Sequence, residues 1–234
     1  ENELAIDHTV YTVDLLGCGR SDKSSITYTN FVYVQMISDF IKKIIGQKTD
    51  VIASGFSGSF VTMACHNEKE LFNKIMLVNP PSLTQLKQMP NRKDRLLKAA
   101  LEIPIFGTLV YHMIVSRDNI NNLFIEKMYY NPFHVDNQMA DAYYEAAHKG
   151  GYYTRFLYSS LAAKYININI CHALKALDNS IYIVEGETEP NGKAVTDDYC
   201  ASNPAIEVSV LKETKHLPHV EAPEAFLEQV KIFF

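Results

Sequence analysis

The sequence predicts an α/β fold in which a mostly parallel sheet is flanked by helices and interrupted by a helical insertion. Over residues 1–81, short β-branched runs alternate with helix-length segments, which is typical of parallel sheets. The same alternation resumes from residue 176. Between these parts the chain is rich in Leu, Tyr, Met and Phe at helical spacing, with breaks at Pro and Gly. We therefore expect a core formed by residues 1–81 and 175–234, with residues 82–174 inserted as a helical cap.

The core elements follow one another in a regular order. A strand is expected at residues 11–15, and a helix at residues 33–45, where Val34, Ile37 and Ile41 recur at helical spacing. Four further strands are expected at residues 50–54, 74–79, 180–186 and 206–211. A turn at residues 55–59 and a helix connect the first two of these strands, and a final helix lies within residues 221–234.

The composition fits one such unit. The chain has 234 residues, of which 47% are apolar and 21% charged, enough for a real core and a charged surface. Its net charge of −5 argues against nucleic acid or an anionic membrane as a main partner, because both favour basic patches. No run approaches the roughly 20 apolar residues of a membrane span. Four widely spaced cysteines without a CxxC pair indicate free thiols and a cytoplasmic protein.

Residues 50–64 are the most informative stretch. A β-branched run stops at Gly55, Ser57 stands among small residues, and a helical run begins at once. Small residues suit a tight turn in which the backbone passes close to a neighbouring strand and helix. The pattern predicts a strand-to-helix turn with Ser57 at its apex, although Ser59 replaces the last glycine of the usual Gly-x-Ser-x-Gly. The alternative is an ordinary strand–helix turn.

Two later segments add an acid and a histidine. Glu189 follows the strand at 180–186, and His216 follows the strand at 206–211. Serine is a poor nucleophile unless an imidazole takes its proton, and that imidazole needs a carboxylate to orient it. The order of serine, acid and histidine along the chain therefore predicts nucleophilic catalysis by Ser57.

These residues carry a resemblance to the α/β-hydrolase superfamily, in the branch with a helical cap. Residues 11–22 resemble its fourth strand and the D-x-x-G-x-G-x-S loop that follows. Residues 215–226 resemble its G-H-x-x-x-x-E-x-P-x-x-F ending, with Lys215 where glycine is common. The resemblance extends over essentially the whole chain and implies an α/β-hydrolase-type sheet.

The resemblance also implies roles for individual residues. Ser57 would be the nucleophile and His216 its base. Glu189 would orient the histidine, in a place where the family usually has Asp, and Glu187 is the alternative acid. The backbone N–H of Gly58 would be one oxyanion donor. The family takes its second donor from a His-Gly-type loop that we do not find, so we expect the chain to lack the first strands and this loop.

The implied activity needs no cofactor and no metal. It is the hydrolysis of a carboxylic ester through an acyl-enzyme, and the aromatic cap favours a small substrate with a hydrophobic acyl or alcohol group. C–C bond hydrolases, thioesterases, amidases and lipases share one triad, so these activities stay open. The alternative from another class is a non-catalytic, ligand-binding or scaffolding member of the fold.

Overall fold

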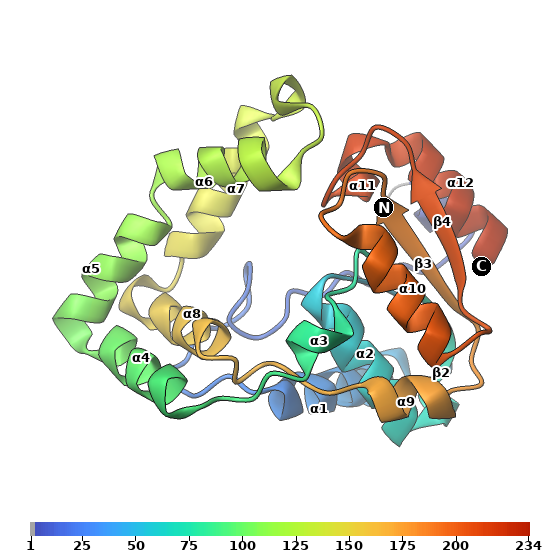
Figure 1. Ribbon diagram of the computed structural model, residues 1–234, viewed down its shortest axis with the longest axis horizontal. Coiled ribbons are helices and arrows are strands. Elements are labelled where there is room, and N and C mark those ends of the chain that lie inside the picture. The colour runs from blue at the N-terminus through green and yellow to red at the C-terminus, as the bar shows by residue number, and fades with distance from the viewer. Residues whose placement is uncertain (1–2) are drawn as a thin grey trace.

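The computed structural model describes residues 3–234, and its centre is a four-stranded parallel sheet (Figure 1). The strands are β1 (Thr49–Ser54), β2 (Phe72–Val78), β3 (Ile181–Gly186) and β4 (Glu207–Leu211). Their spatial order equals their chain order, and each neighbouring pair is parallel. All four strands therefore end at the same edge of the sheet, where the segments that follow them come together.

The two faces of the sheet are covered by different helices. Ile75 and Leu77 of β2 contribute to a core shared with the helices that begin at Asn30, Phe56, Cys171 and Gly192. Met76 and Val78 point to the opposite face, which packs against the last helix of the chain. Because successive side chains of a strand alternate between faces, a strand covered on both sides reads as a continuous apolar run. This explains why the central strands could be predicted from sequence.

Three predicted core helices are present, as Asn30–Phe40 (α1), Phe56–Asn67 (α2) and Pro223–Phe233 (α12). Three helices for which no bounds were predicted also pack with the core: Cys171–Ala176 (α9), Gly192–Ser202 (α10) and Pro218–Glu221 (α11). A π-helical turn, Ile41–Ile45, continues α1. Gly46 then ends the helix in the left-handed conformation that glycine adopts readily. The helix predicted at 33–45 is thus present.

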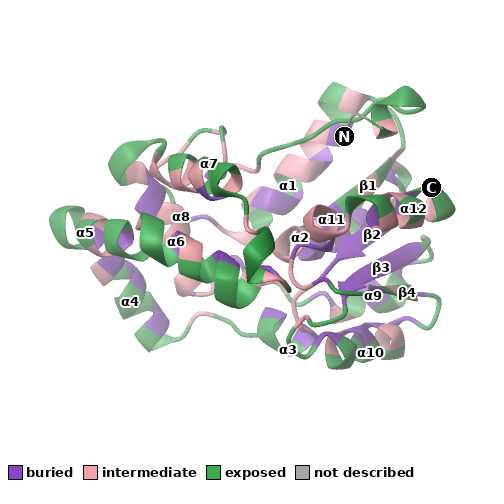
Figure 2. Ribbon diagram, turned by 90° about the horizontal axis from the view of Figure 1, so that it is seen from above, coloured by how far each residue is buried: buried purple, intermediate pink, exposed green. Residues whose placement is uncertain are grey.

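Residues 79–180, between β2 and β3, form helices and loops and no strand. The longer helices are α4 (Arg92–Glu102), α5 (Pro104–Ile114), α6 (Arg117–Leu123), α7 (Asn137–His148) and α8 (Arg155–Ala162), and the short α3 (Leu83–Leu86) precedes them. Helices α4 to α8 lie to one side of the sheet, and Figure 2 shows how much of their surface is exposed. The limits of this cap as a domain stay a prediction.

The described chain has no single helix long and apolar enough to cross a membrane. The helices Arg92–Glu102 and Pro104–Ile114 are long and apolar enough only when taken together, and the chain bends by 96° between them.

The strand predicted at residues 11–15 is wrong, because this segment joins no ladder of the sheet. Val10, Tyr11 and Val13 are 38%, 46% and 44% exposed, so their alternation with other residues buries no face. The segment instead leads into a loop in which the carboxylate of Asp14 accepts the N–H of Arg20 at 2.8 Å.

Candidate active site

The turn between β1 and α2 has Gly55, and not Ser57, at its apex. The strand ends at Ser54, the helix begins at Phe56, and Gly55 between them has φ 57° and ψ −132°. This backbone conformation is strained for any residue with a side chain. The prediction that Ser57 stands at the apex is therefore wrong, because Ser57 is the second residue of the helix.

The structure does not bring Ser57 to the predicted base. The Ser57 hydroxyl donates to the carbonyl oxygen of Ser54 at 2.5 Å. Within residues 3–234, no hydrogen bond joins Ser57 to His216. The first turn of α2 thus holds this hydroxyl against the strand that precedes it.

Gly58 also differs from its predicted role as an oxyanion donor. Its N–H donates to the carbonyl oxygen of Gly55 at 3.1 Å and is therefore occupied. A Cβ at Gly58 would lie 3.1 Å from Cδ2 of Leu77, so glycine here allows α2 to pack closely on β2. Phe56 is the first residue of α2, so its N–H, like the others of the first turn, has no carbonyl partner within the helix.

The structure brings Glu189 and His216 together. Nδ1 of His216 lies 3.1 Å from Oε1 of Glu189. When Nδ1 carries the proton it donates to this carboxylate, which leaves Nε2 free to accept a proton. The alternative acid, Glu187, is bound elsewhere, since its Oε2 accepts the N–H of Glu213 at 3.0 Å. The pair that can act as a base is therefore His216 with Glu189.

Asn79, which the sequence analysis missed, connects the segments that carry this pair. Its side-chain amide donates to the carbonyl oxygens of Lys215 at 2.9 Å and His216 at 3.0 Å. Its Oδ1 accepts the N–H of Gly186, the last residue of β3, at 3.0 Å. Asn79 has φ 43°, a left-handed conformation that asparagine tolerates better than most residues. The sequence signal that could have identified Asn79 is its place between an apolar strand and the pair Pro80-Pro81.

The histidine loop is also tied to the cap. Glu221 accepts the N–H of Lys215 at 2.7 Å and that of Tyr130 at 2.6 Å, so one carboxylate joins the loop to the insertion. The N–H of His216 donates to the carbonyl oxygen of Met128 at 3.1 Å. The position of His216 therefore depends on both the sheet and the cap.

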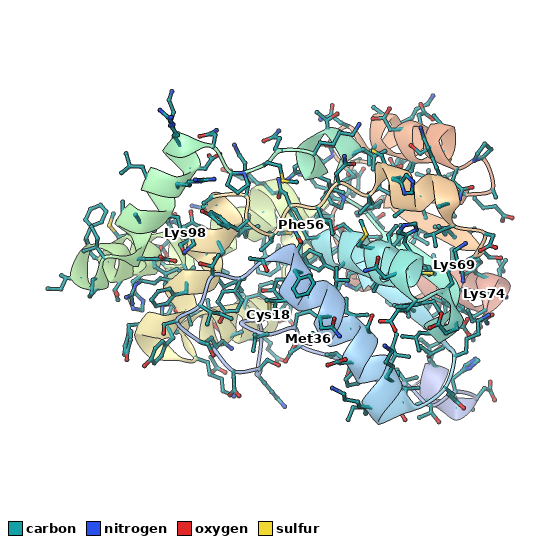
Figure 3. The ribbon with its side chains drawn as sticks, turned by 90° about the horizontal axis from the view of Figure 1, so that it is seen from below. Cys18, Met36, Phe56, Lys69, Lys74 and Lys98 are labelled. Carbon is teal, nitrogen blue, oxygen red and sulfur yellow. The ribbon has the colours of Figure 1, made fainter. Side chains whose placement is uncertain are left out.

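A cavity of about 370 Å³ opens beside this pair. Its wall includes Gly55, Phe56, Asn79, Pro80, Pro81, Glu185, Glu189, Val195 and His216, but not Ser57. Figure 3 shows Phe56 at the start of α2, where the cap helices meet those of the core. The volume falls in the range of small-molecule sites. A wider apolar hollow of about 760 Å³ lies on α5 and includes neither Gly55 nor His216, so it is not the candidate site.

Glu185 is a second acid in the cavity wall that sequence reasoning missed. It is 4% exposed, and its Oε2 has no hydrogen-bond partner among the described residues. Burial raises the pKa of this carboxyl above its ordinary value, and the nearby charge of Glu189 adds to the effect. Its position inside an apolar strand gave no sign of exposure to a cavity. No three His, Cys, Asp or Glu residues of the described chain converge to hold a metal.

Residues 2–229 match the sequence model of the alpha/beta hydrolase family. The chain belongs to this family. No curated protein sequence matches it.

Solved structures show the same fold for this α/β hydrolase. One is a serine hydrolase involved in carbazole degradation, with a TM-score of 0.74 and 15% identity over 94% of this chain and 76% of the other. Another is a meta-cleavage product hydrolase from Pseudomonas fluorescens, with a TM-score of 0.71 and 16% identity over 94% and 77%. A third is a carboxylesterase from the archaeon Nitrososphaera gargenis, with a TM-score of 0.67 and 16% identity over 94% and 77%.

The site of this α/β hydrolase therefore offers three chemical elements and lacks a fourth. It has a base oriented by a carboxylate, an N–H at a helix start that can polarise a carbonyl oxygen, and a cavity between them. The apex of its turn carries a glycine and hence no hydroxyl.

Proposed function

We propose that this α/β hydrolase hydrolyses a small carbonyl compound in the cavity beside His216, and that a carboxylic ester with a hydrophobic group is the first class to test. The observation that carries the proposal is the 3.1 Å contact between His216 and Glu189 in the cavity wall. An imidazole held in one tautomer by a carboxylate is the arrangement that takes a proton from an attacking O–H group.

The remaining wall supports a hydrophobic substrate group. Phe56, Pro80, Pro81 and Val195 supply apolar surface. The polar groups of the wall include His216, the two acids and the side chains of Asn79, Ser82, Gln85, Asn191 and Thr196. Carboxylesterases and meta-cleavage product hydrolases both occur among the structural neighbours. Ester and C–C bond hydrolysis therefore belong in the same substrate panel.

The sequence hypothesis also assigns the attack to Ser57 and predicts an acyl-enzyme. That role requires the Ser57 hydroxyl to leave the carbonyl oxygen of Ser54 and reach His216. The base, its carboxylate and the cavity thus support hydrolysis, whereas the position of Ser57 gives the acyl-enzyme little support.

The test is the initial rate of hydrolysis of p-nitrophenyl esters with increasing acyl length, alongside vinylogous β-diketones. We expect His216→Ala to reduce the rate to background and Glu189→Gln to reduce it by about 10²-fold or more. His8→Ala is the matched control, because His8 is exposed and does not line the cavity. Unchanged turnover in His216→Ala would refute the proposal.

Ligand binding without turnover is the second candidate function, and the glycine at the apex favours it. Calorimetric titration of the same esters and of their acid products distinguishes the two. Saturable binding that His216→Ala weakens, with no product formed, would replace hydrolysis by binding.

A further inference from the structure

We propose that Gly55 occupies the nucleophile position of this site, so that the native chain forms no acyl-enzyme and, if the proposed function holds, water is the attacking group. One backbone position and the hydroxyl groups around it decide this point, whichever carbonyl compound is the substrate.

The first observation is the backbone of the turn. In a nucleophile elbow the attacking residue stands on a sharp, strained turn directly between strand and helix, which exposes its side chain above the sheet. Gly55 alone fills the place between Ser54 and Phe56, and it has the positive φ of 57°. Ser57, by contrast, lies within the helix.

The second observation is what surrounds the apex. Gly55 lies in the cavity wall with His216 and Glu189. Apart from its two chain neighbours, a Cβ on Gly55 would meet no heavy atom within 4 Å, so the site has room for a small side chain. This differs from Gly58, where a Cβ would approach Leu77 closely.

The third observation is that three nearby serine hydroxyls already make hydrogen bonds within the fold. Ser57 donates to Ser54, and the fully buried Ser59 donates to the carbonyl oxygen of Phe56 at 2.7 Å. Ser82 reaches the cavity, but its oxygen accepts the N–H of Gln85 at 3.1 Å and caps α3. None of these three hydroxyls is placed to replace the missing one.

The chemistry then runs through water. The oxygen of a water molecule bonds to the carbonyl carbon while its proton passes to Nε2 of His216, and the C=O electron pair moves onto the oxygen facing the N–H of Phe56. When the C=O bond re-forms, the bond to the alcohol oxygen breaks and that oxygen takes the proton from His216. One ester and one water thus give one acid and one alcohol, and the imidazole is regenerated.

The experiment is labelling of the full chain with a fluorophosphonate probe, which reports an activated serine without any natural substrate. We expect no labelling of the native chain or of Gly55→Ala, and labelling of Gly55→Ser on the peptide that carries the substitution. Gly55→Ser combined with His216→Ala should lose the label, because the new hydroxyl then has no base. Ester turnover should rise in Gly55→Ser. The increase should be at most about 10⁶-fold, the factor by which removing the triad serine lowers kcat in a serine protease.

Labelling of the native chain at Ser57 would overturn the inference, as would a folded Gly55→Ser variant that stays unlabelled. Circular dichroism and thermal melting establish folding. If Gly55→Ser does not fold, intact-mass spectrometry of the native chain quenched during ester turnover decides, since an acyl adduct refutes the inference and its absence supports it. An inactive ester panel would refute the proposed function and leave the labelling result standing.

Discussion

Replacing Asn79 by Ala should loosen the histidine loop and lower both stability and turnover. The substitution removes three hydrogen bonds, at 2.9, 3.0 and 3.0 Å, to Lys215, His216 and Gly186. Each bond contributes about 0.5–1.5 kcal/mol, and alanine is also less suited than asparagine to φ 43°. We expect the free energy of unfolding to fall by about 2–5 kcal/mol.

Two measurements separate positioning from stability. Urea denaturation gives the loss of unfolding free energy, and ester hydrolysis below the melting range gives kcat and KM for the folded variant. We expect kcat to fall more than KM changes, because the loop that carries the base becomes mobile while the apolar wall remains. Asn79→Asp should keep the bond from Gly186 and lose the two donated to the loop, giving an intermediate result.

Asn203 provides the matched control. It is buried like Asn79, and its side-chain amide donates to the carbonyl oxygens of Leu174 and Leu177 at 2.9 and 3.0 Å, away from the site. Asn203→Ala should cost stability but leave kcat of the folded protein unchanged. An Asn79→Ala variant that loses less than about 1 kcal/mol, or that matches Asn203→Ala in kcat, would refute the positioning role.

Three further predictions concern stability. Because burial raises the pKa of Glu185, the folded state binds this proton more tightly than the unfolded state, and stability falls as the pH rises through the folded pKa. Glu185→Gln should therefore raise Tm at pH 8 more than at pH 4; an equal shift at both would contradict this. Burial and the neighbouring His216 lower the pKa of His219, so stability should fall as the pH drops through about 6.5, and His219→Gln should reduce the change in Tm between pH 7.5 and 5.5. Ile183 is fully buried in β3, and Ile183→Ala should cost about 2–5 kcal/mol in urea denaturation; a loss below 1 kcal/mol would mean that the core is not packed as described.

Much of the sheet could be predicted because buried parallel strands read as apolar runs with clear ends. β3 at Ile181–Gly186 and β4 at Glu207–Leu211 lie within one residue of their predicted bounds. Residues 11–15 misled the prediction because apolar alternation indicates a strand only when one face is buried, and here the apolar side chains are largely exposed. Burial depends on tertiary neighbours and cannot be read from the alternation itself.

The site residues that follow strand ends could be predicted from the sequence. The residue at the apex of the first turn could not, because its identity depends on where in the sequence the turn begins. Glu189 and His216 come after β3 and β4, so parallel pairing alone brings their loops to one edge. The apex of the first turn was misplaced by two residues, because the pattern was read around Ser57 as Gly-x-Ser-x-Ser. The residue most able to take a positive φ was Gly55, and this was the signal that could have corrected the register.

The glycine at the apex also changes the balance between stability and chemistry in this site. A residue with a side chain in this backbone conformation costs about 1–3 kcal/mol, which a serine hydrolase accepts because the strain exposes its nucleophile. With Gly55 at the apex, the site has neither this cost nor a hydroxyl. The hydrogen bonds that connect the site to the rest of the fold are still present. Asn79 joins β2 to the end of β3 and to the histidine loop, and Glu221 joins that loop to the cap. The His216–Glu189 pair can therefore be maintained by structural contacts alone, and its presence is not by itself a sign that the covalent step has been kept.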